Sequence, residues 1–208
     1  MGIYRIKSIS TDSTIGLWEM TESWQELVAL ADLEPLELLQ LEDKKTDKRK
    51  LEWLACRMLL QEMTSLPPII THDKNRKPHL KNSDYQLSMS HSGAFACVYI
   101  SKATPVGVDV QQMKPSISKG IDYFLGANEQ QWINPADNVL LHLIWSAKES
   151  VFKYAGDPDL DLKKDLAANA FESNQNGNFE VSILKPGQTK VVPIAYETFA
   201  DYVLTWTI

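Results

Sequence analysis

Two short stretches of the sequence hold most of the side chains that could do chemistry. Residues 107–111 run Gly-Val-Asp-Val-Gln, and residues 145–153 run Trp-Ser-Ala-Lys-Glu-Ser-Val-Phe-Lys. The first stretch has the pattern of a strand with one acidic side chain, and the second has that of a helix with two lysines and a glutamate. Carboxylates suit a hard divalent cation, and lysines suit phosphate oxygens. Together the stretches predict a site for a divalent metal ion and a polyphosphate.

The strand around Asp109 is expected to have two different faces. Its alternating valines would share one face of a sheet, and the opposite face would carry Gly107, Asp109 and Gln111. Asp109 could ligate a hard cation there, and Gly107 would let a ligand or a backbone approach closely. The alternative for Asp109 is an ordinary solvated or turn-forming aspartate.

The helix around residues 145–153 contains one lysine that its apolar pattern does not explain. Lys148 falls near the middle of a stripe formed by Leu141, Ile144, Trp145, Phe152 and Ala155. A lysine at that position must reach water or meet an anion. Glu149 and Lys153, four residues apart, could be a simple surface pair. Such a pair leaves Lys148 unexplained, whereas a pyrophosphate group with Mg²⁺ accounts for all three side chains.

Two further segments could bind an anion. Residues 87–93, Leu-Ser-Met-Ser-His-Ser-Gly, combine hydroxyls, the His91 imidazole and exposed turn amides. The basic loop 74–81 holds Lys77, followed by the stiff Pro78. By itself, residues 87–93 could equally be an ordinary hairpin turn, and Lys77-Pro78 carries little weight alone.

Composition limits the class of protein. The chain has 208 residues, of which 44% are hydrophobic, so it can bury a sizeable core. Its formal net charge of −6 argues against general nucleic-acid binding. No apolar run approaches the roughly 20 residues of a membrane helix, and MGIYRIKSIS lacks the apolar region of a secretory signal. We therefore expect a cytoplasmic protein whose cysteines, Cys56 and Cys97, are reduced and mostly buried.

The order of predicted elements is similar in the two parts of the chain. In the first part we expect strands at 2–9, 14–20, 69–71, 85–90 and 94–100, and helices at 24–31, from Pro35, and at 43–63. In the second part we expect strands at 106–111, 178–185, 190–198 and 201–207, and a long helix at 137–155. Ser23 and Glu26 form a predicted capping box for the first helix.

This order predicts an α+β fold made of two similar α/β halves, residues 1–104 and 105–208. We expect the halves to be related by a pseudo-twofold axis, each with a long helix packed on a small, mainly antiparallel sheet. No repeat is visible at the level of single residues.

Taken in chain order, the motifs resemble the 4′-phosphopantetheinyl transferase superfamily, most closely its larger, monomeric, two-lobed type. The resemblance spans about residues 70–155. It is carried by Lys77-Pro78, Ser90-His91-Ser92-Gly93, Gly107-Val108-Asp109-Val110, and residues 145–150 with Lys153. The last motif is the most specific of the four.

The resemblance implies a holo-[acyl-carrier-protein] synthase, that is, a 4′-phosphopantetheinyl transferase. Such an enzyme moves the phosphopantetheine arm of coenzyme A onto a serine of an apo acyl or peptidyl carrier protein and releases adenosine 3′,5′-bisphosphate. It implies Mg²⁺ as cofactor, an active site between the two halves, and no nucleic-acid or membrane partner.

The resemblance also assigns roles to residues. Asp109 and Glu149 would hold Mg²⁺ on the pyrophosphate, and Glu149, directly or through a water, would help take the proton of the carrier serine. Lys153 and Lys148 would stabilise charge on the pyrophosphate. A further set would bind the nucleotide end of coenzyme A: Lys77, Ser90 and His91, with Arg49 and Arg57 as further basic contacts.

Two positions depart from the family pattern. Gln111 stands at the third metal-binding position, where larger members often carry glutamate, and a neutral amide binds Mg²⁺ less well than a carboxylate. Arg76 stands where the family often has glycine before Lys-Pro. Gln111 leaves open an alternative, a relative that binds coenzyme A or a carrier protein without transfer. An unrelated Mg²⁺-dependent nucleotide enzyme is disfavoured because the chain has no phosphate-cradling glycine loop.

Overall fold

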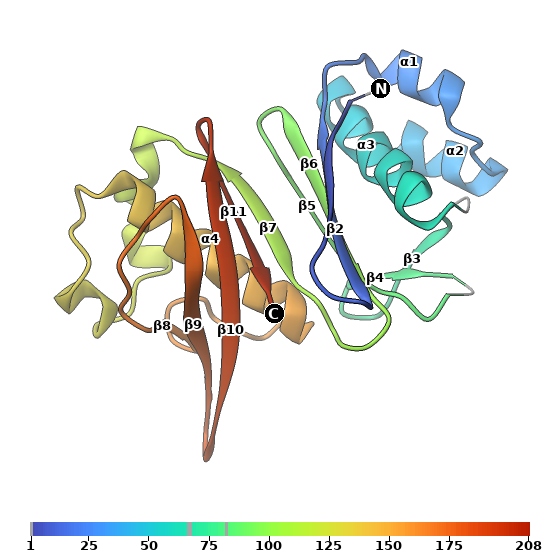
Figure 1. Cartoon of the computed structure of the whole chain (residues 1–208). Helices are drawn as coiled ribbons and strands as arrows, with labels where there is room; N and C mark the ends of the chain where they lie inside the picture. Colours follow the sequence, from blue (N-terminus) through green and yellow to red (C-terminus); the bar gives the residue numbers. More distant parts are fainter. Residues whose placement is uncertain (1, 66–67, 82) are drawn as a thin grey trace. The chain divides into compact units, whose positions relative to one another are not determined.

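The computed structural model describes residues 2–65, 68–81 and 83–208, and the chain forms two compact units (Figure 1). The first unit comprises Met1–His72 and Pro78–Thr104, and the second comprises Asp73–Lys77 and Pro105–Ile208. Each unit packs a long helix on an antiparallel sheet. The expected α+β fold of two halves is therefore confirmed.

The sheet of the first unit has six strands in the order β1-β2-β6-β5-β4-β3, and every neighbouring pair is antiparallel. Alternating apolar residues in these segments favour strands with one face toward a helix. The strands are β1 (Ile3–Ser8), β2 (Ser13–Glu19), β3 (Ile70–His72), β4 (Pro78–Leu80), β5 (Gln86–Ser92) and β6 (Phe95–Ser101).

Three helices cover this sheet or pack beside it, and the sequence predicted all three. Helix α1 (Trp24–Leu30) has the predicted capping box between Ser23 and Glu26, and α2 (Pro35–Glu42) begins at its proline. Helix α3 (Asp47–Thr64) begins at Asp47 rather than at residue 43. The difference arises because the Thr46 hydroxyl accepts a hydrogen bond from the Arg49 amide and caps the helix there.

Helix α3 supplies the core of the first unit. It packs on β2 and β6 and lies beside α1. Because its apolar residues recur at helical spacing, they line the side of α3 that faces the sheet. The buried residues of α3 in this core are Leu54, Ala55, Cys56, Met58, Leu59 and Leu60. Cys56 and, on β6, Cys97 are both buried, as expected.

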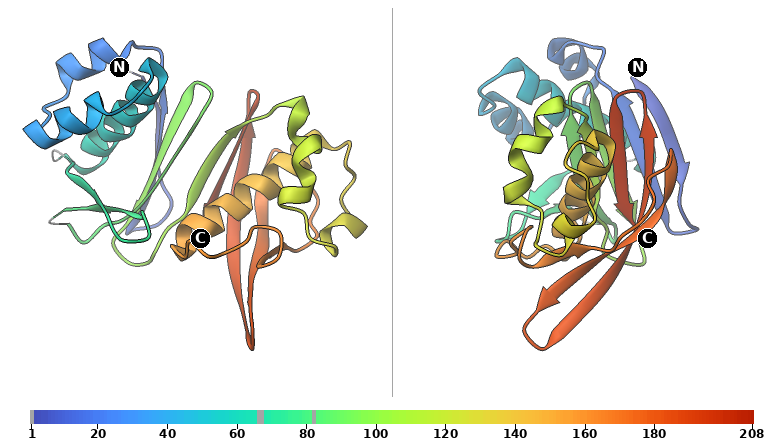
Figure 2. Two further views of the ribbon diagram at one scale, coloured as in Figure 1. Left: turned by 180° about the vertical axis from the view of Figure 1, so that it is seen from behind. Right: turned by 90° about the vertical axis from the view of Figure 1, so that its left-hand side faces the viewer.

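The sheet of the second unit has five strands in the order β7-β11-β10-β9-β8, again all antiparallel. The long β9–β10 hairpin extends beyond the other strands of this unit (Figure 2). The strands are β7 (Val108–Gln112), β8 (Leu166–Ala168), β9 (Asn176–Lys185), β10 (Gln188–Phe199) and β11 (Tyr202–Thr207).

Helix α4 (Asn138–Ala155) runs along one face of this sheet and packs on β7 and β11 (Figure 2). The Asp137 side chain accepts a hydrogen bond from the Leu140 amide at its start, and Gly156 ends it with φ +62°. The predicted helix at 137–155 is thus confirmed. Its buried apolar residues form the core of this unit with β8, β9 and β10.

Of the short elements, β3 matches the strand predicted at 69–71, whereas others were not predicted from the sequence. They are β4 within the expected basic loop, β8, and two 3₁₀ helices, η1 (Pro115–Tyr123) and η2 (Glu129–Gln131). Each of the two short strands has three residues, which is too short for a clear alternation of apolar and polar side chains. In the described part of the chain no helix is both long enough and apolar enough to cross a membrane.

Candidate functional site

Asp109 lies on β7 with its side chain on the face of the sheet that packs against α4. It pairs with Thr205 of the neighbouring strand β11, and 5% of its surface is exposed. The Ser146 hydroxyl of α4 donates to the Asp109 carbonyl at 3.3 Å, and Lys153 Nζ lies 2.7 Å from Asp109 Oδ1. The alternative of a solvated aspartate therefore does not describe this residue.

Gly107 explains how α4 comes so close to β7. A Cβ atom at this position would collide with the backbone oxygen of Ser150 and lie 2.8 Å from the Tyr154 amide. Gly107 was expected to allow the close approach of either a ligand or a backbone. The structure shows the close approach of the α4 backbone. That approach brings the second turn from the end of α4 onto β7, beside Asp109.

Glu149 and Lys153 of α4 form one electrostatic cluster with Asp109. Burial raises the pKa of the Glu149 carboxyl, and the negative charge of Asp109 raises it further, while Lys153 opposes the rise. Lys153 Nζ also donates to the Val108 carbonyl at 3.1 Å. Its side chain is 26% exposed, so Lys153 is only partly buried.

The donor set of this cluster fits Mg²⁺. Mg²⁺ in proteins is usually held by one or two carboxylates, with phosphate oxygens and waters completing the shell. Asp109 and Glu149 supply two carboxylates; burial and, after it, the charge of Asp109 raise the pKa of Glu149, and a bound cation would oppose that rise. Gln111, half-buried on the same strand, offers an amide oxygen. No group of three or more His, Cys, Asp or Glu side chains gathers within the described residues.

Lys148 lies next to Glu149 in sequence, but its side chain points into the protein. It is fully buried, and its ammonium group donates to Glu129 Oε2 at 2.6 Å and to the carbonyls of Phe124 and Leu162 at 2.6 and 3.0 Å. Burial lowers the pKa of Lys148, and the charge of Glu129 partly restores it. The anion that Lys148 meets is therefore a carboxylate of this chain.

Glu129 is the partner that the sequence analysis did not identify. It is 1% exposed, and besides Lys148 it accepts hydrogen bonds from the Gly126 amide at 2.7 Å and the Ala168 amide at 2.8 Å. The only sequence signal for it was the unexplained Lys148 itself, since a buried ammonium requires an acidic partner.

Lys77 belongs to the second unit, where it lies against the end of α4. Its ammonium group donates to the Tyr154 carbonyl at 3.0 Å, and its side chain would meet a Cβ at Gly156. Burial lowers the pKa of Lys77, and Asp73 opposes that shift. A cation at a helix C-terminus is favourable, so Lys77 stabilises the end of α4. The preceding Arg76 adopts φ +65°, a left-handed backbone conformation that favours glycine.

In the first unit the structure brings Arg49 and His91 together. Arg49 Nη1 of α3 lies 3.4 Å from His91 Nε2 of β5, and both contact the carboxylate of Glu52. Their side chains are 61% and 36% exposed, so they form a basic surface. Ser90, which precedes His91 on β5, is 7% exposed. The sequence could not place Arg49, and it did not single out Glu52.

Arg57, the other arginine of α3 considered above, is placed quite differently. It is 4% exposed, its Nε donates to Glu37 Oε1 at 3.1 Å, and its guanidinium lies 3.2 Å from the centroid of the Trp53 ring. Burial lowers its pKa to about 10 despite the pairing with Glu37. These contacts join α2 to α3 and occupy the guanidinium inside the protein.

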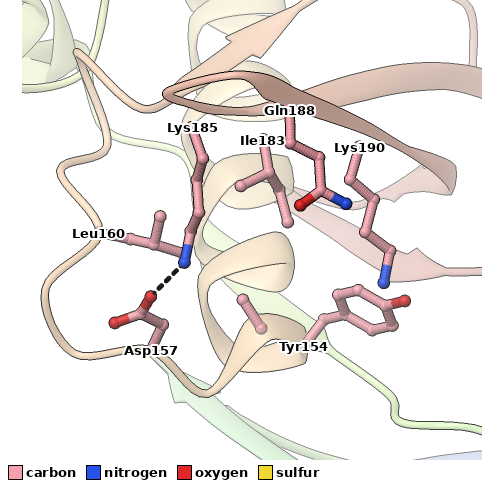
Figure 3. Close-up of a pocket in the computed structure, with 8 residues that line it drawn as sticks. Tyr154, Asp157, Leu160, Ile183, Lys185, Gln188 and Lys190 are labelled. Carbon is pink, nitrogen blue, oxygen red and sulfur yellow. Dashed lines mark hydrogen bonds and ion pairs between the residues drawn. The ribbon is translucent and has the colours of Figure 1, made fainter.

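A pocket of about 290 Å³ in the second unit lies near the end of α4, and none of the predicted site residues lines it (Figure 3). Lys185 Nζ lies 2.6 Å from Asp157 Oδ2, and Lys190 Nζ lies 4.7 Å from the centroid of the Tyr154 ring. Of the other labelled lining residues, Leu160 and Ile183 are apolar and Gln188 is polar. Each of its two lysines is thus engaged within the chain.

Comparison with known proteins gives two matches. Residues 105–207 match the family model described as the 4′-phosphopantetheinyl transferase superfamily. The chain is also 31% identical over 109 residues to the 4′-phosphopantetheinyl transferase psf-1 of Bacillus pumilus. That match covers 48% of this chain and 46% of the relative, so it spans about half of each protein.

Proposed function

Because this chain belongs, through residues 105–207, to the 4′-phosphopantetheinyl transferase superfamily, we propose that it is a Mg²⁺-dependent transferase acting on coenzyme A. The acceptor is a serine of an apo acyl or peptidyl carrier protein. The single observation that carries this proposal is the cluster of Asp109, Glu149 and Lys153. Asp109 lies on β7 and Glu149 on α4, which packs on β7. The charge of Asp109 adds to the effect of burial on the pKa of Glu149, and the partly exposed Lys153 lies 2.7 Å from Asp109 Oδ1.

The reaction is the attack of the carrier serine hydroxyl on the pyrophosphate of coenzyme A. A bond forms between the serine oxygen and the phosphorus that carries the pantetheine arm. The bond from that phosphorus to the bridging oxygen breaks, and adenosine 3′,5′-bisphosphate leaves. Glu149 takes the serine proton, directly or through a water.

Asp109 and Glu149 would hold the metal ion, with the Gln111 amide oxygen or a water at a third position. A bound Mg²⁺ supplies positive charge to the pyrophosphate oxygens as the leaving group departs. Lys153 supports the same charge from its place 2.7 Å from Asp109 Oδ1, where it can move from carboxylate to phosphate.

Lys148 has a different task in this proposal. Its ammonium group is enclosed by Glu129 and two backbone carbonyls, so it anchors α4 and leaves phosphate binding to Lys153. It is a positioning residue for its neighbour Glu149.

The nucleotide end of coenzyme A would be bound by basic residues outside this cluster. We assign this role to Arg49, Ser90 and His91 of the first unit; the role that the resemblance gives Lys77 stays a prediction, because its ammonium group donates to the Tyr154 carbonyl. Arg49 and His91 are supported by their 3.4 Å approach and their exposure. We leave Arg57 out of this set because its guanidinium is buried against Glu37 and Trp53.

A carrier protein of acidic surface would be attracted by local positive charge even though the chain has a formal net charge of −6. The sequence offers two basic segments, residues 44–50 and 74–81, for such an encounter.

The test uses a fluorescent coenzyme A analogue, Mg²⁺ and a panel of apo carrier proteins from fatty-acid, polyketide and peptide synthesis. We expect at least one carrier to become labelled on its serine, and Glu149→Gln or Asp109→Asn to reduce the rate by about 100-fold or more. Glu172→Gln, an exposed carboxylate of the same unit, is the matched control and should label at the wild-type rate. Unchanged labelling in both site variants would refute the site.

A second candidate function is favoured by Gln111, the amide at a metal-binding position. In that case the protein binds coenzyme A or a carrier without transfer. Tight binding of coenzyme A measured by calorimetry, with no labelling of any carrier at any Mg²⁺ concentration, would identify this function instead.

A further inference from the structure

Glu52 of α3 is a buried carboxylate that contacts three basic side chains of the first unit. Its residue is 4% exposed. Its oxygens lie 2.9 Å from Arg49 Nη1, 3.4 Å from His91 Nδ1 and 3.8 Å from Lys48 Nζ. The proposed function assigns no role to this carboxylate.

The three basic side chains reach outward from the buried carboxylate. Lys48 and Arg49 are 66% and 61% exposed, and His91 is 36% exposed. One negative charge therefore lies inside, and two permanent positive charges with an imidazole lie at the surface above it. This arrangement presents a basic surface of fixed geometry to an anion, because the carboxylate contacts one nitrogen of each side chain and so holds the three together.

The orientation of the His91 ring follows from its two neighbours. A guanidinium can only donate a hydrogen bond and a carboxylate can only accept one. The ring nitrogen Nδ1 faces Glu52 Oε1, and Nε2 faces Arg49 Nη1. Nδ1 therefore carries a proton that it donates to Glu52, and Nε2 lies at the outer end of the ring beside the guanidinium.

We propose that Glu52 is a positioning residue that directs His91 Nε2 and the Arg49 guanidinium at one terminal phosphate, the 3′-phosphate of coenzyme A. The inference rests on the proposed function, since it specifies how the nucleotide end is recognised. With a phosphate present, the imidazolium donates from Nδ1 to Glu52 and from Nε2 to a phosphate oxygen. Arg49 donates to the same phosphate from its other guanidinium nitrogens, while Nη1 stays on Glu52 Oε2 at 2.9 Å.

Whether Glu52→Gln strengthens or weakens phosphate binding distinguishes a positioning role of Glu52 from a purely electrostatic effect of its charge. Glu52 carries a negative charge close to the basic surface, so by charge alone its removal would strengthen the binding of any phosphate. If Glu52 positions the two donors, its removal weakens binding of the 3′-phosphate. The two accounts therefore predict opposite changes for Glu52→Gln.

The experiment compares the dissociation constants of coenzyme A and dephospho-coenzyme A, which lacks only the 3′-phosphate, by calorimetry. We expect wild-type protein to prefer coenzyme A, and Glu52→Gln to reduce that preference about tenfold. Affinity for dephospho-coenzyme A should stay within about twofold of wild type. A purely structural role would weaken both ligands alike. An unchanged or increased preference would overturn the inference.

Two controls make the result specific. Glu37→Gln alters another buried carboxylate, one that pairs with Arg57 of the same helix, and should leave the preference unchanged. In the His91→Ala background, Glu52→Gln should reduce the preference by less than it does in the wild-type background, because Arg49 is then the one donor of the pair that Glu52 still contacts. A full effect of Glu52→Gln in that background would contradict positioning through His91.

Failure of this inference is distinguishable from failure of the proposed function. Wild-type protein that binds neither ligand would overturn both. Wild-type protein that transfers the arm and prefers coenzyme A, with the preference retained in Glu52→Gln, would overturn only the role of Glu52. Should Glu52→Gln fail to fold, Glu52→Asp keeps the charge, shortens the side chain, and is judged by the same ratio of dissociation constants.

Discussion

Lys148 Nζ lies 2.6 Å from Glu129 Oε2, and both side chains are buried in the second unit. The next residue on α4, Glu149, points instead to the cluster with Asp109 and Lys153. Two adjacent residues of one helical turn thus serve different purposes. Lys148 pairs with Glu129 in the interior, and Glu149 lies in the cluster to which we assign the chemistry.

Lys148→Met should destabilise the protein severely. It leaves the Glu129 carboxylate buried without its cation, and breaking one partner of a buried pair costs about 3–5 kcal/mol. The free energy of unfolding from urea titration would measure the loss. Lys164→Met is the matched control: this lysine is 80% exposed and pairs only loosely with Asp161, so its removal should cost under about 1 kcal/mol.

The double variant Lys148→Met/Glu129→Gln should recover part of the stability, since no unpaired charge remains. If Lys148→Met were as stable as wild type but bound coenzyme A much more weakly, Lys148 would be a phosphate ligand, and its assignment here to a positioning role would be wrong.

The helix around Lys148 shows what a pattern of residue types can and cannot predict. Helical spacing predicted α4 and identified Lys148 as the one charge that needed an anion. The identity of that anion could not be predicted, because Glu129 lies on a short 3₁₀ helix that has no periodic signal. Only the folded chain brings the two side chains together.

Gln111→Glu should strengthen Mg²⁺ binding. It adds a carboxylate to β7 beside Asp109, and carboxylate oxygens bind Mg²⁺ better than amide oxygens. We expect the Mg²⁺ concentration for half-maximal labelling to fall on the order of tenfold. A matched Gln112→Glu variant on the same strand should leave that concentration unchanged. Equal values for wild type and Gln111→Glu would exclude residue 111 from the metal shell.

Ionisation of Glu149 should lower the stability of the protein as the pH rises, whereas the same ionisation is needed for activity. Its folded-state pKa is raised by burial and by Asp109, so its contribution to stability is present below the unfolded value of 4.5 and is lost as pH rises through the folded pKa. At neutral pH, Glu149→Gln should therefore raise Tm while abolishing labelling. Scanning calorimetry without Mg²⁺ at neutral pH and at pH 4 measures this. A Tm gain of equal size at both pH values would contradict the raised pKa.

The same shift predicts the acid limb of activity. Glu149 must be ionised to hold metal and to take a proton, so labelling should decline at a pH above 4.5, the value for an ordinary glutamate. Saturating Mg²⁺ should move that limb to lower pH, because a bound cation favours the carboxylate.

Arg76→Gly should stabilise the turn before Lys77 relative to Arg76→Ala. Residue 76 adopts φ +65°, a conformation that costs a residue with a Cβ about 1–2 kcal/mol. Glycine avoids this cost, so we expect Arg76→Gly to exceed Arg76→Ala in unfolding free energy by about 1 kcal/mol. Urea titration of both variants provides the comparison, and equal stabilities would show that the left-handed conformation carries no penalty.

More of the fold than of the site could be predicted from the sequence. Long periodic segments such as residues 137–155, and capped ends such as Ser23 with Glu26, predicted the helices because local interactions fix them. The approach of Lys153 to Asp109 and of His91 to Arg49 depends on packing between elements far apart in the sequence. Lys148 and Arg57 show that residue type alone does not identify a phosphate ligand. Both are basic, and both are paired with a buried glutamate inside the protein.

The central claim is that Glu149 and Asp109 support transfer of phosphopantetheine to a carrier serine. Its most direct test is intact-mass spectrometry of an apo carrier protein incubated with this protein, coenzyme A and Mg²⁺. We predict a mass gain of one phosphopantetheine group with wild-type protein and with Glu172→Gln, and none over the same time with Glu149→Gln. No mass gain on any carrier with wild-type protein, or an equal gain with Glu149→Gln, would contradict the account.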